Sequence, residues 1–208
     1  MTLKDLITTG KIPKLPIYVD SPMALAALHF YREAIAEKSP EIRAELLNLK
    51  EDPFDPGSLF EATSIEDSKA LNAPSQPCII ISASGMATGG RVVHHLENML
   101  PNPNNSVLLV GYQAIGTRGH SLLTGAKSIK MYGKFIDVQA EIVQIEEFSV
   151  HADNNELLTW FGSAKSKPEV VFAVHGETDS AETFAKLIQS KLGWNATVPE
   201  LNRIYELH

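Results

Sequence analysis

The sequence predicts an α/β protein, in which a parallel sheet with flanking helices is followed by a smaller β/α part. Short apolar runs alternate with helical patterns over residues 1–125, and this order is typical of a parallel sheet covered by helices. The run Cys78–Ile81 is continuously apolar, as in strands that are buried on both faces. In residues 126–208 the segments become short and alternating, which predicts a second domain that begins with hairpin strands.

The first domain contains three predicted strands, each followed by a predicted helix. The strands are expected at residues 15–20, 77–82 and 107–111, and the helices at residues 22–36, 91–99 and 117–124. Ser21 and Pro22 are a suitable N-cap and first position for the first of these helices. Residues 40–75 show no clear pattern, apart from a loop around Pro53 and Pro56.

The second domain is predicted to contain a hairpin, two helices and a final strand. The strands are expected at residues 129–133, 135–138 and 203–207. Asp153 and Glu156 have the spacing of an N-cap and its capping-box partner, which predicts a helix from this point. The pair Asp179 and Glu182 repeats this spacing and predicts the second helix.

The composition excludes several classes of protein. With 208 residues, 44% of them hydrophobic and 21% charged, the chain is typical of a globular protein rather than a disordered one. The formal net charge of −7 disfavours nonspecific binding of polyanions, although a local basic groove remains compatible with it. No stretch approaches the roughly 18 apolar residues of a membrane span, and the single cysteine, Cys78, excludes an internal disulfide. We therefore expect a cytoplasmic protein without membrane association.

A glycine-rich turn between the second strand and its helix is the first candidate site. Its candidate phosphate-binding residues are Ser84, Gly85, Thr88, Gly89, Gly90 and Arg91. The amides of such a turn can approach an anion closely, the helix N-terminus adds partial positive charge, and an arginine can donate two hydrogen bonds to phosphate. The glycines serve a tight turn equally well, so the structural and functional interpretations have about equal weight. The turn matches neither a P-loop nor a dinucleotide-binding pattern.

His94 and His95 lie in the helix that follows this turn. Adjacent helical residues point about 100° apart. We therefore expect at most one of the two histidines to face a site.

Two histidines that follow strand-like runs, His151 and His175, are the second candidate site. Imidazole can bind a metal or transfer a proton near neutral pH, and Asp153 or Glu177, two residues later, could fix its tautomer. For each histidine alone a structural role is commoner, while Asp153 could serve only as a helix cap and Glu177 only as a first-turn carboxylate. The chain has no His-x-His-x-Asp-His cluster or other closely spaced ligand set, so these residues would form half of an active site.

Five segments, in this order, resemble one family specifically. They are residues 16–24, 82–96, 110–117, 148–153 and 174–177. Their combination is similar to the C-terminal half of the β-CASP nucleases, an RNA-processing group with a metallo-β-lactamase fold. The resemblance implies that residues 1–125 are most of the β-CASP domain. It also implies that residues 126–208 are the C-terminal β/α part of a metallo-β-lactamase sandwich.

The resemblance implies a role for each candidate residue. His175 matches a zinc ligand, and His151 matches a catalytic histidine that faces the scissile phosphate. In the family, two zinc ions activate water for attack on the phosphodiester. The turn from Ser84 to Arg91 would line the groove that binds RNA, although DNA is not excluded as a substrate. The expected function is therefore that of a zinc-dependent RNA-processing nuclease.

The chain departs from the family pattern because the His-x-His-x-Asp-His motif and the other metal ligands precede the matching region. A fragment of a longer enzyme, a short protein that needs a partner and a binding module are the three explanations. We expect a fragment whose site is completed by a missing N-terminal metallo-β-lactamase half, and negligible nuclease activity of the chain alone. The main alternative is a non-catalytic RNA-binding or protein-interaction module, which could be a homodimer. A nucleotide enzyme is a weaker third class, because its phosphate motifs are missing.

Overall fold

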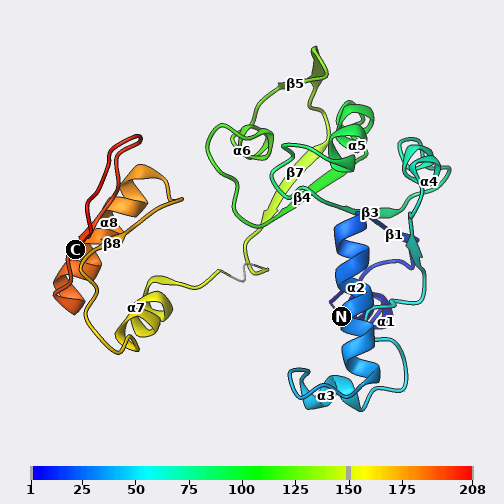
Figure 1. The fold of residues 1–208 in the computed structure, drawn as a ribbon. Coiled ribbons are helices and arrows are strands. Elements are labelled where there is room, and N and C mark those ends of the chain that lie inside the picture. Colours follow the sequence, from blue (N-terminus) through cyan, green and yellow to red (C-terminus); the bar gives the residue numbers. More distant parts are fainter. Residues whose placement is uncertain (1, 149–150, 208) are drawn as a thin grey trace. The chain divides into compact units, whose positions relative to one another are not determined.

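The computed structural model describes residues 2–148 and 151–207, which belong to two units (Figure 1). The units comprise Met1–Glu147 and Phe148–His208, and each is described by itself. The helices are α1 (Thr2–Thr8), α2 (Pro22–Ala36), α3 (Ala44–Leu47), α4 (Ile65–Ala70), α5 (Arg91–Met99), α6 (Arg118–Leu123), α7 (Asn154–Gly162) and α8 (Thr178–Leu192). The strands are β1 (Ile17–Asp20), β2 (Leu59–Glu61), β3 (Ile79–Ser82), β4 (Ser106–Val110), β5 (Ser128–Met131), β6 (Lys134–Asp137), β7 (Glu141–Ile145), β8 (Val171–Phe172) and β9 (Ala196–Thr197).

The first unit contains a three-stranded parallel sheet in the order β2-β1-β3. In the central strand, Ile17 lies between Leu59 and Ile79 in the register and is fully buried. The hydroxyl of Ser21 accepts a hydrogen bond from the α2 backbone at 3.2 Å, and Pro22 occupies the first position of α2. The mixed α/β class and this first strand-to-helix turn are therefore confirmed.

A second pair of parallel strands, β4 and β7, lies in the main core of the first unit (Figure 1). The buried members of this core are Ala87, Val93, Leu96, Leu100, Leu109, Leu122, Ile129, Met131 and Ala140. They come largely from the glycine-rich turn, α5, β4, α6 and β5. Apolar packing therefore fixes the glycine-rich turn relative to the elements around it.

β5 and β6 form an antiparallel hairpin, as the sequence predicts. Ile129 and Met131 of β5 are 5% and 0% exposed, whereas Lys130 between them is exposed. This alternation is typical of a hairpin that packs one face on a core and presents the other to solvent.

The second unit packs α7 and α8 with the short parallel pair β8 and β9. Its core contains Ala185, Ile188 and Ala196, with Phe161 and Trp194 packed against them. The rings of Phe161 and Trp194 meet edge to face, with centroids 6.1 Å apart. This small core positions the N-terminal ends of α7 and α8, which follow the two candidate histidines.

Three predictions about elements are wrong. Residues 203–207 form no strand, and Ile204 among them is 89% exposed, because no neighbouring strand in the described unit pairs with this segment. α8 begins at Thr178 with Glu177 as its N-cap, so Asp179 lies in the first turn instead of capping the helix. β7 lies in residues 127–148, where short alternating segments predict hairpin strands, but it pairs in parallel with β4, since its apolar alternation is satisfied by either partner.

The backbone before each candidate histidine is also less extended than predicted. β7 ends at Ile145, a turn includes Phe148, and residues 149–150 of the expected run lie outside the described residues. β8 ends three residues before His175, whose φ of 68° is left-handed. Within the described residues, neither histidine directly continues a strand.

The first unit extends past the predicted domain boundary near residue 125. β5 and β7 follow this position and still pack with the first unit. The compact units divide between Glu147 and Phe148 and not at the predicted boundary. The assignment of residues 126–208 to a separate domain stays a prediction. In the described ranges, no helix is long and apolar enough to span a membrane.

Candidate functional site

The glycine-rich turn presents hydroxyl groups at the surface between β3 and α5. The hydroxyls of Ser84 and Thr88 lie 3.0 Å apart and form a hydrogen bond across the turn. Gly85, Thr88 and Gly90 are exposed. Between them, Ala87 is 2% exposed and belongs to the main core, so it anchors the turn. The turn therefore combines a fixed interior with polar side chains and backbone that solvent can reach.

α5 begins directly after the turn without a side-chain cap. Its N-cap is Gly90, with φ 75° and ψ −169°, a conformation that glycine adopts far more readily than any other residue. The first turn of α5 contains no acidic side chain. The first N–H groups of the helix and its dipole therefore place partial positive charge at the turn, which favours an anion there.

The segment from Gln113 to Gly119, which follows β4, binds four consecutive carbonyl groups of the turn. The side-chain amide of Gln113 donates to the first at 3.1 Å, and the backbone N–H of Gly119 donates to the second at 2.9 Å. The guanidinium of Arg118 donates to the third and fourth at 3.2 and 3.1 Å. These carbonyls belong to Gly85, Met86, Ala87 and Thr88. Carbonyl oxygens carry partial negative charge and repel anions. Because these four accept hydrogen bonds from the protein, they oppose the binding of a phosphate at the turn less strongly.

Gln113 is packed against Gly119 beneath the turn. Gln113 is 4% exposed, and its Oε1 atom has no hydrogen-bond partner among the described residues. A methyl group at Gly119 would lie 1.7 Å from this Oε1 atom, so the packing requires a glycine. Gln113, Arg118 and Gly119 are not among the site residues that the sequence predicts. Their only local signal is a glycine inside a predicted helix, which often indicates close packing.

Arg91 and Asp20 form an ion pair behind the turn. One guanidinium nitrogen of Arg91 donates to the Asp20 carboxylate and, at 2.9 Å, to the backbone carbonyl of Ala62. The Arg91 side chain is 21% exposed and that of Asp20 is 0% exposed. Arg91 therefore ties the start of α5 to β1 and to the segment after β2. Its predicted contact with phosphate stays a prediction.

Asp20 is the centre of a wider buried network. The Ser68 hydroxyl donates to its Oδ2 atom at 2.6 Å, and Nε2 of His95 lies 2.6 Å from the same atom. The other ring nitrogen of His95 lies 2.8 Å from Oδ1 of Asn72. Burial raises the pKa of Asp20, but hydrogen bonds from these two donors and from Arg91 lower the pKa more, so it falls below its usual value. Asp20 is not among the site residues that the sequence predicts, and its only signal there is a carboxylate at the end of a strand.

His94 and His95 point in different directions, as predicted. His95 is 5% exposed and faces Asp20. His94 is exposed, and its ring stacks on that of Tyr132 with centroids 4.9 Å apart. Only His95 therefore belongs to the network behind the turn.

His151 and His175 both lie in the second unit, each two residues before the N-cap of a helix, and both are exposed. Asp153 caps α7 by accepting hydrogen bonds from two backbone N–H groups at 2.8 Å. Glu156 accepts from the Asp153 N–H at 2.9 Å, which confirms the predicted capping box. Glu177 is the N-cap of α8 and makes no side-chain capping bond. The catalytic role of His151, the metal-binding role of His175 and the ring-orienting roles of Asp153 and Glu177 stay predictions.

The metal chemistry of the described residues is limited. Within residues 2–148 and 151–207, no three histidine, cysteine, aspartate or glutamate side chains form a group that could hold a metal ion. A zinc site normally has three or four protein ligands. These residues therefore do not fit a complete zinc site, and we derive no catalytic step through a metal.

Two family models match the chain. Residues 1–122 match the Beta-Casp domain, and residues 136–199 match the Zn-dependent metallo-hydrolase RNA specificity domain. Together they cover both candidate sites.

Known proteins match over most of this chain. It is 36% identical to a ribonuclease of Thermus thermophilus over 88% of its length. It is 34% identical to an RNase J-like protein of Methanocaldococcus jannaschii, and 32% identical to the transcription termination factor FttA of Pyrococcus abyssi, each over 96% of its length. The matches cover 42%, 44% and 31% of the three proteins, so the chain spans less than half of each.

Proposed function

Because the chain belongs to the β-CASP family of metallo-β-lactamase-fold RNA nucleases, we propose that it forms the RNA-binding part of an RNA-processing nuclease. In this proposal, RNA lies against the glycine-rich turn, and His151 and His175 belong to the catalytic centre. DNA is the alternative substrate. It is less favoured, because the names of the matching domain and of one relative refer to RNA.

The geometry of the glycine-rich turn carries this proposal. Its carbonyl groups are satisfied by the segment from Gln113 to Gly119, and the α5 N-terminus beside it is uncapped. A phosphate would accept hydrogen bonds from the α5 amides and from the hydroxyls of Ser84 and Thr88. Such contacts hold the RNA backbone in register without reading its sequence.

The two histidines would supply chemistry at the scissile phosphate. We assign His151 the transfer of a proton to or from a reacting oxygen, which is a common role of an imidazole. We assign His175 as a ligand of one of two zinc ions, supported by the zinc dependence that the second domain's name gives. Asp153 and Glu177 would orient these rings from behind. The remaining ligands would come from outside these 208 residues, in a metallo-β-lactamase half of the same enzyme.

RNA affinity of the chain tests the role of the turn. A carboxylate introduced by Thr88→Asp places negative charge where the phosphate would bind, so we expect at least about a tenfold loss of affinity for a single-stranded RNA oligonucleotide. Asn104→Asp, at an exposed position in the loop before β4, adds the same charge away from the turn and is the matched control. Fluorescence anisotropy at fixed salt measures both. Equal affinity of the two variants would remove the turn from the binding site.

A non-catalytic RNA-binding module is the second candidate function. It is favoured by one observation, namely that the glycine-rich turn and the uncapped start of α5 lie within the described residues and would bind phosphate without a metal. Adding the missing metallo-β-lactamase half in trans separates the two functions. RNA cleavage that depends on His151 supports the nuclease, and RNA binding without cleavage in that mixture supports the module.

A further inference from the structure

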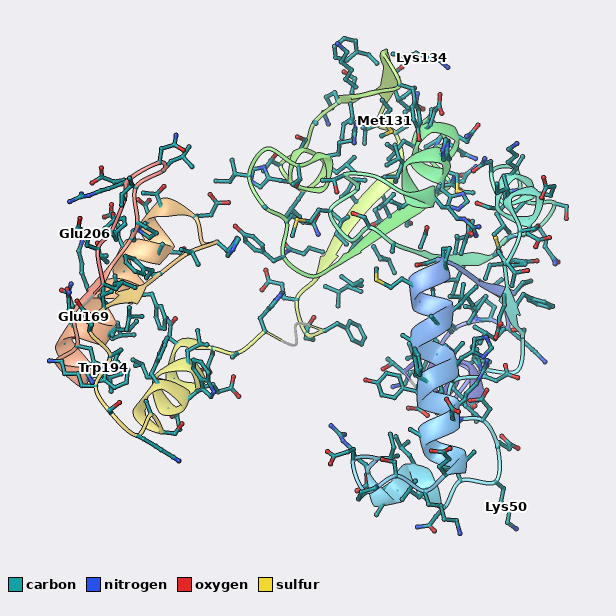
Figure 2. The ribbon with its side chains drawn as sticks, viewed as in Figure 1. Lys50, Met131, Lys134, Glu169, Trp194 and Glu206 are labelled. Carbon is teal, nitrogen blue, oxygen red and sulfur yellow. The ribbon has the colours of Figure 1, made fainter. Side chains whose placement is uncertain are left out.

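The β5–β6 hairpin carries an exposed aromatic side chain that contributes nothing to the core. Phe135 is 72% exposed and lies opposite Lys130 in the antiparallel register. Met131, on the opposite face of β5, is fully buried. Figure 2 shows Lys134 at the far end of the same hairpin. Phe135 and Lys130 therefore lie side by side on the face of the hairpin that is turned away from the core, where an aromatic ring and a cation are open to solvent.

In the part of the chain that the structure describes, two cations on or beside β5 form no ion pair with a carboxylate, although the exposed Asp137 lies on the same face of the hairpin as Phe135. Among the described ion pairs, none includes Lys130 or Arg118, although the whole chain carries a formal charge of −7. Arg118 donates through Nε to the carbonyl of Lys130 at 3.1 Å, and through another nitrogen to the carbonyls of Ala87 and Thr88. One guanidinium therefore links the backbone of β5 directly to the glycine-rich turn.

The tip of the hairpin contacts α5. Tyr132 and Gly133 form the two-residue turn and have φ values of 48° and 81°. A left-handed conformation is unusual for tyrosine, since asparagine or aspartate normally occupies this position of such a turn. The Tyr132 ring stacks on His94, and its hydroxyl lies 3.1 Å from Nε2 of His94. This contact and the ion pair of Lys134 with Glu97 connect the hairpin to the helix that starts at the glycine-rich turn.

We propose that the outer face of the β5–β6 hairpin binds single-stranded RNA, with a base stacked on Phe135 and the adjacent backbone phosphates on Lys130 and Arg118. This extends the proposed function, on which it rests, because the same strand would continue to the glycine-rich turn. Base stacking on an aromatic side chain beside cations is the usual mode of sequence-tolerant binding of single strands. The bases of a duplex are already stacked on one another, so the site selects unpaired RNA.

Stacking is tested by substitutions at Phe135. Phe135→Ala is expected to lower the affinity for a single-stranded RNA oligonucleotide at least about fivefold, whereas Phe135→Trp keeps a ring and stays close to wild type. Phe30→Ala is the matched control, because Phe30 is 71% exposed on α2, away from the hairpin, and its loss should leave affinity unchanged. Lys130→Gln should reduce the slope of log affinity against log salt by about 0.7.

The oligonucleotide supplies an independent readout. Replacing its bases with abasic sites removes stacking and keeps the phosphates. The wild-type chain should lose affinity on this change, and the Phe135→Ala variant should lose almost none. A merely structural role of Phe135 would lower affinity for normal and abasic RNA alike, which would overturn the proposal.

The remaining outcomes separate this inference from the proposed function. If Thr88→Asp weakens RNA binding but Phe135→Ala does not, the turn binds RNA and the hairpin inference is wrong. If the wild-type chain binds no RNA, both are wrong. If Phe135→Ala changes only the oligomeric state in sedimentation, the ring is a contact between copies of the chain, and the RNA inference is again overturned.

Discussion

Asp20 has no exposed surface and accepts hydrogen bonds from three side chains. The pair with Arg91 joins the end of β1 to the start of α5, while Ser68 and His95 bring α4 and the interior of α5 to the same carboxylate. A buried ion pair adds little stability compared with well-packed apolar side chains of similar volume. Removing one partner is nevertheless destabilising, because it leaves the other charge buried and uncompensated. Asp20 therefore holds β1, α4 and α5 together beside the glycine-rich turn.

Replacing this carboxylate should destabilise the first unit. We expect Asp20→Asn to lower the free energy of unfolding by about 3–5 kcal/mol, because Arg91 loses its buried counter-charge. Unfolding in urea, followed by far-ultraviolet circular dichroism, measures the change. Both tryptophans, Trp160 and Trp194, lie in the second unit, so their fluorescence reports that unit separately and should not shift. Asp137→Asn, at an exposed carboxylate of β6, is the control and should stay within about 0.5 kcal/mol of wild type.

The same carboxylate makes the stability of the first unit depend on pH. Its pKa in the folded chain is below the usual value, so its contribution is present above about pH 4, the ordinary value of an aspartate. The contribution is lost as the pH falls through the lower, folded-state pKa. The stability difference between wild type and Asp20→Asn should therefore shrink as the pH is lowered from 7 towards 2. A difference that stays constant over this range would show that the charge of Asp20 is not what stabilises the unit.

The sequence predicts some residues of the site and not others, for a physical reason. Ser84, Thr88 and Gly90 are recognisable because a glycine-rich turn between a strand and a helix is a local pattern. Asp20 and Gln113 are not, because their roles depend on partners 71 and 28 residues away along the chain. Burial of a polar side chain is a tertiary property, and only the fold supplies its partners.

The glycine-rich turn and α5 act together as one element. Gly90 ends the turn in a conformation that other residues adopt at a cost, and its missing side chain leaves room for the carbonyl of Ala83. The hydrogen bonds from Arg118 and Gln113 hold the turn from the other side. The conformation of the turn is therefore fixed by Gly90 and by these hydrogen bonds before any ligand is present.

A methyl group should be tolerated at one glycine of the turn and not at its neighbour. In Gly90→Ala the added Cβ would lie 3.2 Å from the Ala83 carbonyl oxygen, at a φ of 75°, so we expect a loss of about 1–3 kcal/mol of stability. Gly89→Ala has open space around its Cβ and should be neutral or stabilising by up to about 1 kcal/mol. Thermal unfolding of the two variants, followed by circular dichroism, makes the comparison. Equal melting temperatures would contradict the role given to Gly90.

Elements with local signals were predicted well, and elements defined by long-range pairing were not. α2 and α6 begin at capping residues, Ser21 and Thr117, whose chemistry is visible in the sequence. β2 is only three residues long and lies in a region without a clear pattern, so its place in the sheet appears only with β1 beside it. The same limit explains β7, whose parallel partner β4 is separated from it by a helix and a hairpin.

At the scale of the whole chain, the two units supply different parts of one proposed function. The first unit holds the glycine-rich turn and the hairpin, which bind phosphate and bases in our proposals. The second unit holds His151 and His175, without further ligands grouped around them in the described residues. In our proposals the chain therefore binds RNA, and most of the metal ligands of the catalytic centre come from outside these residues.

The chain alone should therefore show negligible nuclease activity. Imidazole without a completed metal site provides only general acid–base assistance, which contributes about 10²–10⁴-fold and leaves phosphodiester cleavage very slow. Cleavage of a fluorescently labelled RNA with added zinc measures this. Turnover that co-purifies with the chain and disappears in His175→Ala would contradict the expectation, whereas activity that survives this substitution would indicate a contaminating nuclease.

Zinc binding by the purified chain tests the central claim most directly. The zinc content after purification, followed by calorimetric titration, gives both stoichiometry and affinity. We predict little bound zinc and weak binding, with tight binding appearing only when the metallo-β-lactamase half that we propose as the source of the other ligands is added. Tight stoichiometric zinc in the 208-residue chain, lost in His175→Ala, would mean that a complete site assembles from these residues or between two copies, and would contradict the half-site account.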